Sequence, residues 1–113
     1  MKYLIIIISI LIINIFQEPK VVMLSGEQVK IKVDTNSQLI SREIQLLKSA
    51  KITKAEGNCN GFWIQKETIT VHKFSKLEKS IGTVLKPGKY TVYPILRKNQ
   101  TKAKIKLTLN VNQ

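Results

Sequence analysis

The chain is poor in the residues that carry catalytic and cross-linking chemistry. Among its 113 residues there are a single cysteine, Cys59, a single histidine, His72, and a single aspartate, Asp34. A lone cysteine cannot form a disulfide within the chain, which excludes a disulfide framework. No group of such residues has the spacing of a metal site, and there is no glycine-rich phosphate loop. The sequence therefore predicts no metal, no cofactor and no catalytic residue.

The residues that could still support an enzyme are scattered. Cys59 and His72 would form a thiol–imidazole pair only if the fold brought them together, and the strand pattern gives no reason for that. The glutamates beyond the N-terminal segment lie among lysines, where surface ion pairing explains them better than acid–base chemistry. They are Glu27, Glu43, Glu56, Glu67 and Glu78. We predict that the protein is not an enzyme.

Negative charge is also scarce. The chain has 7 acidic residues against 19 Lys and Arg, a formal net charge of +12. Such a field favours anionic polymers or anionic surfaces. The lysines are spread over the polar half of the strand alternation, where they also discourage edge-to-edge aggregation. Two interpretations stay open: solvated strand faces, which we favour, and a dedicated polyanion-binding surface.

If a polyanion-binding surface exists, the sequence predicts it on Lys102, Lys104 and Lys106, which recur at every second residue. Lys30 and Lys32 would extend this patch if segment 28–34 lies in the same sheet. The partner would be a protein or an anionic polymer of the cell envelope or extracellular space. Nucleic acid is disfavoured, because no aromatic residue is interleaved with a basic cluster as a stacking platform requires.

There is one long hydrophobic run, residues 4–16, preceded by Lys2. Its thirteen residues span roughly 20 Å as a helix, which is shorter than a bilayer core and typical of a signal peptide. No small-residue cleavage site follows it, so a retained anchor is the alternative. We predict a signal peptide or membrane anchor over 1–18 and an exported domain over 19–113. Membrane contact would occur only through residues 4–16, if they remain uncleaved.

From Lys20 onward the hydrophobic period is mostly two, which predicts strands. We expect them over 20–24, 28–34, 62–65, 67–74, 89–96 and 102–111. Segments 25–27 and 56–61 read as turns, and 76–80 as a polar connector with one helical turn. Segment 39–47 fits either a helix or a strand, and we favour a strand from about residue 44 to Ile52.

The C-terminal third predicts a hairpin. A loop centred on Asn99 and Gln100 would pair strand 89–96 with strand 102–111 in a register that places apolar opposite apolar. The predicted pairs are Leu96 with Ala103, Pro94 with Ile105, Val92 with Leu107, and Tyr90 with Leu109. Pro94 cannot donate to a ladder, which implies an edge, a bulge or an outward-facing nitrogen.

The step Leu85-x-Pro87-Gly88-x-Tyr90, which we read as a type II turn at Lys86–Lys89 leading into a strand, resembles a corner of immunoglobulin-like and fibronectin type III sandwiches. The resemblance implies an all-β, antiparallel β-sandwich of about seven strands. It also implies that the Tyr90 hydroxyl bonds back to nearby backbone, and it makes Trp63 the candidate core aromatic between the sheets.

Asn99-Gln100-Thr101 forms an N-glycosylation sequon on the loop before the last strand. A chance match in a polar turn is the alternative. Together these patterns predict an exported, non-enzymatic β-sandwich with a binding or structural role in the cell envelope or outside the cell. The alternatives are a small membrane-anchored subunit of a larger assembly and a basic polyanion-binding protein.

Overall fold

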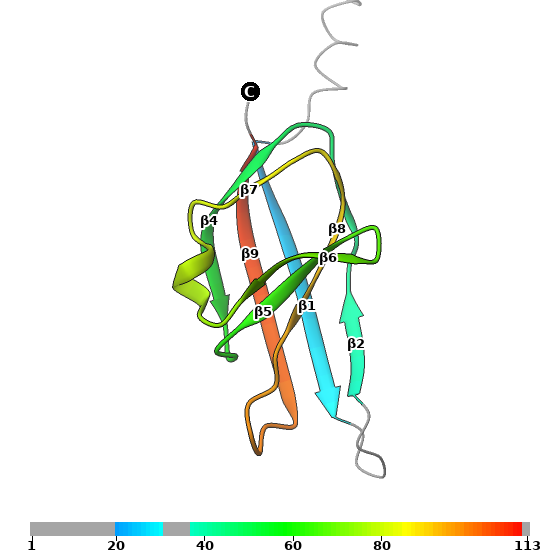
Figure 1. The fold of residues 1–113 in the computed structure, drawn as a ribbon, viewed down its shortest axis with the longest axis vertical. Coiled ribbons are helices and arrows are strands. Elements are labelled where there is room, and N and C mark those ends of the chain that lie inside the picture. The colour runs from blue at the N-terminus through cyan, green and yellow to red at the C-terminus, as the bar shows by residue number, and fades with distance from the viewer. Residues whose placement is uncertain (1–19, 31–36, 112–113) are drawn as a thin grey trace, which may run out of the picture.

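Two antiparallel sheets stack face to face in the computed structural model, which describes residues 20–30 and 37–111 (Figure 1). Sheet A has the strand order β2-β1-β9-β4-β7, and sheet B has the order β3-β8-β5-β6. The predicted all-β, antiparallel β-sandwich is thus confirmed, with nine described strands rather than about seven. The predicted leader over 1–18 lies outside the described residues.

The element bounds follow the alternation closely in the second half of the chain. The strands of sheet A are β1 (Val21–Lys30), β2 (Ser37–Ser41), β4 (Ala50–Gly57), β7 (Val84–Leu85) and β9 (Lys102–Val111). Those of sheet B are β3 (Ile44–Leu46), β5 (Phe62–Lys66), β6 (Ile69–Phe74) and β8 (Gly88–Pro94). One turn of 3-10 helix, η1 (Leu77–Ser80), lies in the predicted connector.

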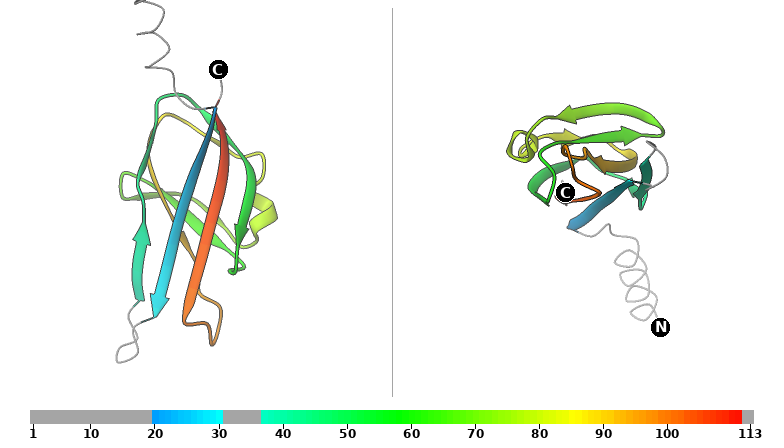
Figure 2. Two further views of the ribbon diagram at one scale, coloured as in Figure 1. Left: turned by 180° about the vertical axis from the view of Figure 1, so that it is seen from behind. Right: turned by 90° about the horizontal axis from the view of Figure 1, so that it is seen from below.

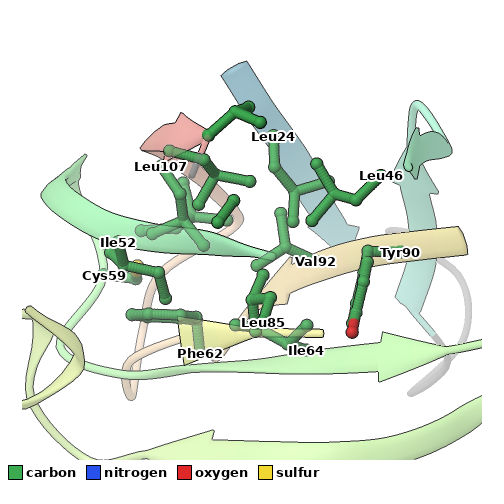
Figure 3. Close-up of a cluster of buried hydrophobic side chains, with 14 of the residues drawn as sticks. Leu24, Leu46, Ile52, Cys59, Phe62, Ile64, Leu85, Tyr90, Val92 and Leu107 are labelled. Carbon is green, nitrogen blue, oxygen red and sulfur yellow. The ribbon is translucent and has the colours of Figure 1, made fainter. Parts of the chain in front are cut away.

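The core lies between the sheets and is built from the inward half of each alternation (Figure 3). Sheet A contributes Leu24, Ile52, Ile105, Leu107 and Leu109, and sheet B contributes Leu46, Phe62, Ile64, Tyr90 and Val92. Each large apolar side chain buried here stabilises the fold by about 1.5–3 kcal/mol. The end-on view in Figure 2 shows the two layers that enclose this core.

Trp63 is not the core aromatic that the resemblance implied. Phe62, its neighbour in β5, is fully buried and packs on Phe74 with ring centroids 5.2 Å apart. Because successive side chains of a strand point to opposite faces, Trp63 must lie on the outer side of sheet B. There it remains half-buried against Tyr93.

The turn predicted at residues 25–27 is wrong. Strand β1 runs without interruption through Gly26, which pairs with Ile105 on one side and Ser41 on the other. A Cβ built on Gly26 would lie 1.7 Å from the Val92 carbonyl oxygen of β8 in the opposite sheet. Glycine is therefore present because the two backbones meet here. In the sequence, a glycine needed for such a contact looks the same as a glycine in a turn.

The predicted pairing of 89–96 with 102–111 is also wrong. Strand β9 has the predicted bounds, but it pairs with β1 and β4 in sheet A, whereas β8 pairs with β3 and β5 in sheet B. Val92 and Leu107 both point into the core, as expected, but from opposite layers. Inward alternation is the same for two paired strands and for two strands that face each other across a core.

The tyrosine corner is present. The Tyr90 hydroxyl donates to the Lys86 carbonyl oxygen four residues upstream, as the resemblance implied. The type II turn predicted at Lys86–Lys89 is wrong. The chain bends at Pro87 as it crosses from β7 in sheet A to β8 in sheet B, and Gly88, with a φ of 154°, already belongs to β8. In the immunoglobulin fold the strand with the corner pairs with the last strand of the chain, whereas here β8 pairs with β3 and β5. The likeness is therefore one of sandwich architecture and of the corner.

Pro94 sits where its missing N–H is harmless, as predicted. Strand β3 pairs only with residues 88–90 of β8, so the same side of β8 has no strand partner beyond that point. The N–H of Val92 on this side donates instead to the Ser41 hydroxyl at 3.0 Å. The nitrogen of Pro94, two residues further along, faces the same direction, so its missing N–H leaves no ladder hydrogen bond unmade.

Segment 39–47 is extended, so the helical alternative is wrong. It contributes the end of β2 and the whole of β3, and a break at 47–49 separates β3 from β4. Glu67 and Thr68 form the β5–β6 turn with positive φ angles of 50° and 74° instead of beginning a strand. The turn predicted over 56–61 is confirmed at its centre, residues 58–60.

Gly26→Ala tests the backbone contact between the sheets. We expect it to lower the free energy of unfolding by about 1–3 kcal/mol, at the upper end, because a backbone carbonyl cannot swing aside as a side chain can. Ser25→Ala on the exposed neighbouring position should change it by less than about 0.5 kcal/mol. Urea unfolding followed by circular dichroism measures both. Equal stability of the two variants would contradict the contact.

Tyr90→Phe tests the corner. Removal of the hydroxyl should cost about 1 kcal/mol of unfolding free energy, because one intramolecular hydrogen bond is lost while the ring stays buried. Tyr93→Phe, on the outer side of sheet B, is the matched control. If Tyr93→Phe destabilised the protein as much as Tyr90→Phe, the corner bond would have no special weight.

Candidate functional site

The predicted lysine stripe lies on the outer face of sheet A and is accompanied by carboxylates. Lys102, Lys104 and Lys106 are exposed side chains of the central strand β9. Glu27 of β1 lies 3.9 Å from the Lys102 ammonium and 3.6 Å from that of Lys104. Glu56 of β4 pairs across the sheet with Lys106 and lies 3.5 Å from Lys54. Acidic residues thus offset part of the charge of this face.

Lys30 does not extend the stripe, although β1 and β9 are neighbours as the extension required. Val29 is the residue that lies opposite Lys102, so Lys30 points to the other side of sheet A. The same alternation directs Gln28 to that side. Lys32 lies outside the described residues.

Lys30 instead lines a groove. The groove lies at the end of the sandwich where β1 ends and β9 begins, and these two strand ends lie side by side in Figure 1. The groove is open to solvent and has a volume of about 820 Å³. We call it the end groove. It is lined by Gln28, Lys30, Ser37, Trp63, Thr70, Lys73, Ile95, Leu96, Arg97, Lys98, Asn99 and Gln100.

The end groove is strongly basic. Its lining includes four cations, Lys30, Lys73, Arg97 and Lys98, all exposed, and no carboxylate among the described residues that form it. The depression beside the stripe on sheet A differs, since Glu27 and Glu56 line it together with Arg42, Lys104 and Lys106. Of the two surfaces, only the end groove has several cations and no carboxylate among its described lining residues.

A β-bulge places Lys73 beside Trp63. From the β5–β6 turn, Lys66 pairs with Ile69 and Gln65 with Thr70, and unbroken pairing would then set Trp63 opposite His72. The register shifts by one residue between Ile64 and Gln65, so Trp63 faces Lys73 instead. The same shift brings Phe74 opposite the buried Phe62. One register shift thus sets both the Phe62–Phe74 pair of the core and the Trp63–Lys73 pair of the outer face.

Hydrogen bonds fix the loop that carries Arg97, Lys98 and Asn99. The Gln100 side chain accepts from the Arg97 N–H at 2.9 Å and donates to the Asn58 carbonyl at 2.8 Å. Asn58 in turn accepts from the Lys104 N–H at 2.7 Å. The loop is therefore tied to the turn that follows β4 and, through Asn58, to β9, and the groove has a preformed rim.

Sequence reasoning missed Lys73, Arg97 and Lys98 as a group because Lys73 comes from β6 and the other two from the loop between β8 and β9. Trp63 was identified, but for the core. No local signal joins these residues, since the register shift in β5–β6 and the crossing of the 95–101 loop between sheets bring them together. Asn99 is exposed at the groove, so a glycan on the predicted sequon would stand there.

Cys59 is buried and its environment is not that of a nucleophile. Its thiol donates to the Lys104 carbonyl oxygen, with sulfur and oxygen 3.7 Å apart. Burial raises the pKa of this thiol, against smaller opposing effects of a backbone hydrogen bond and of Arg97. His72 lies on β6 with its ring stacked on Phe74.

Within residues 20–30 and 37–111, no three or more His, Cys, Asp or Glu side chains are grouped so that they could hold a metal ion. No helix in the same part of the chain is long and apolar enough to cross a membrane.

Comparison of the chain with protein-family models, with curated proteins and with solved structures finds no match. The end groove is therefore the feature of the molecule from which a function can be inferred.

The Cys59 environment predicts slow thiol chemistry. At neutral pH a thiol-reactive probe should label Cys59 at least roughly tenfold more slowly than free cysteine, because a raised pKa and burial both reduce the accessible thiolate. Addition of denaturant should restore the reference rate. Labelling of the native protein as fast as the free thiol would contradict this environment.

Proposed function

We propose that the protein is a non-catalytic β-sandwich binding module that receives an anionic polymer in the end groove, in the cell envelope or outside the cell. The observation that carries the proposal is the convergence of four cations around Trp63 with no carboxylate among the described lining residues. Uncompensated positive charge in a concave surface concentrates the field and attracts polyanions.

The alternative surface, Lys102–Lys104–Lys106, is a weaker candidate. Its two closest ion pairs share Glu27, so an incoming anion would have to compete with a carboxylate already in place. Exposed pairs of this kind contribute little to stability, and they are well explained as solvated strand surface. The charge of the stripe is thus expected to add to long-range attraction but not to form the binding site.

The preformed rim supports the proposal because it reduces the conformational entropy that the loop would lose on binding. A loop that must be ordered on binding reduces affinity, because conformational freedom is lost at that moment. Gln100 already joins Arg97 to Asn58, so the loop backbone that carries Arg97 and Lys98 is held before a ligand arrives.

A matched pair of double variants tests the site, with heparin as the polyanion probe. Arg97→Gln/Lys98→Gln removes two charges from the end groove, and Lys104→Gln/Lys106→Gln removes two from the stripe. We expect the groove variant to bind at least tenfold more weakly and to show a shallower dependence on salt between roughly 50 and 200 mM, because fewer counterions are released. The stripe variant should stay within about threefold of the parent, as isothermal titration calorimetry would measure.

Equal losses in the two variants would mean that net charge alone attracts the probe, and the proposal would fail. Loss confined to the stripe variant would move the site to sheet A. Both substituted pairs are exposed side chains, so thermal unfolding should report intact folds for both.

A further inference from the structure

The side of the end groove formed by sheet B continues onto the outer face of that sheet. Tyr93, Trp63 and Lys73 are cross-strand neighbours on β8, β5 and β6, and the adjacent row in the same strands is Thr91, Gln65 and Thr70. Neighbouring strands are about 4.8 Å apart, so each row spans roughly 10 Å. This surface, which we call the aromatic face, consists of these six residues.

The aromatic face has two kinds of chemistry side by side. The rings of Trp63 and Tyr93 have centroids 5.5 Å apart and an interplanar angle of 37°, so they form an uneven, half-buried apolar platform. The second row offers two hydroxyls and one amide, which both donate and accept hydrogen bonds. No carboxylate occurs among these six residues.

A sugar ring matches both rows. Its C–H groups carry partial positive charge and suit the negative face of an aromatic ring, while its hydroxyls suit hydroxyl and amide partners. Acidic groups on the same chain would meet Lys73 at the end of the platform and Lys30, Arg97 and Lys98 in the groove beyond it.

We propose that the anionic polymer is an acidic polysaccharide, with sugar rings packed on Trp63 and acid groups directed to the cations of the end groove. This inference rests on the proposed function and names the class of its ligand. Single-stranded nucleic acid fits less well. Its binding sites place successive bases on successive aromatics, whereas the rings of Trp63 and Tyr93 lie against each other and, of the two, only Trp63 is among the described residues that line the groove.

The chain provides its own spectroscopic reporter, because Trp63 is its single tryptophan. The full-length protein is titrated with polygalacturonate, a polymer of acidic sugars, and separately with inorganic polyphosphate, which has charge but no rings. We expect polygalacturonate to shift the emission of Trp63 and to protect it from acrylamide quenching. Polyphosphate should bind without either change, because it contacts only the cations.

Substitution at the platform separates this inference from the proposed function. Trp63→Ala should weaken polygalacturonate binding at least tenfold and leave polyphosphate binding within about twofold, as calorimetry measures. Trp63→Phe, which keeps an aromatic face, should recover most of the affinity. If Trp63→Ala does not fold, Trp63→Leu, which keeps an apolar side chain but has no aromatic face, is the test variant and should show the same loss.

Each outcome has a distinct meaning. Polygalacturonate binding that is insensitive to Trp63→Ala and silent in fluorescence would overturn the inference and leave the basic groove standing. Failure of both polymers to bind would remove the proposed function as well. Tighter, Trp63-dependent binding of oligothymidylate than of polygalacturonate would replace the polysaccharide with nucleic acid.

Discussion

The junction of Gly26, Ser41 and Val92 determines how the two sheets sit on each other. At Gly26 the backbone of β1 touches the backbone of β8, with no side chain between them. Beside it, the Ser41 hydroxyl of β2 accepts from the Val92 N–H at 3.0 Å and donates to the Ser25 carbonyl at 2.9 Å. One hydroxyl therefore satisfies a polar group of each sheet. Because an unsatisfied buried N–H is costly, this arrangement fixes β8 against the β1–β2 pair.

The end groove follows from that junction. With β8 held at Val92, the chain turns out of sheet B after Pro94, and Ile95 anchors the exit through its N–H to the Gly61 carbonyl at 2.9 Å. Strand β1 meanwhile continues past the contact to Lys30, whose N–H bonds to the Thr101 carbonyl at 2.8 Å. The inward side of β1 changes along its length from buried Leu24 to half-buried Gln28 and exposed Lys30. The core thus ends and a hydrated, basic concavity begins on one continuous strand.

Sequence patterns predicted the structural features that depend on residues close together in the chain. The alternation in 102–111 gave β9 its full extent, and the step before Tyr90 indicated the corner bond, because both are local in origin. The pairing of β8 and β9 could not be read in this way, since inward-facing residues look the same in a hairpin and across a core. Gly26 carried a turn signal, but its cause is an atom 66 residues away in the sequence, the Val92 oxygen. The Trp63–Lys73 neighbourhood depends on a single bulge, which also sets Phe74 opposite Phe62.

The distribution of charge shows most clearly where prediction from sequence patterns ends. The lysines of β9 and the cations of the end groove cannot be told apart by composition, and β9 has the more regular spacing. What separates them is where the few carboxylates lie, and strand pairing decides that. Glu27 lies opposite Lys104 because β1 pairs with β9 in this register, and the same register turns Lys30 to the other side of the sheet. Among the described residues, cations therefore gather without a carboxylate in the same lining only where the tertiary structure separates them from the glutamates, which net charge alone does not reveal.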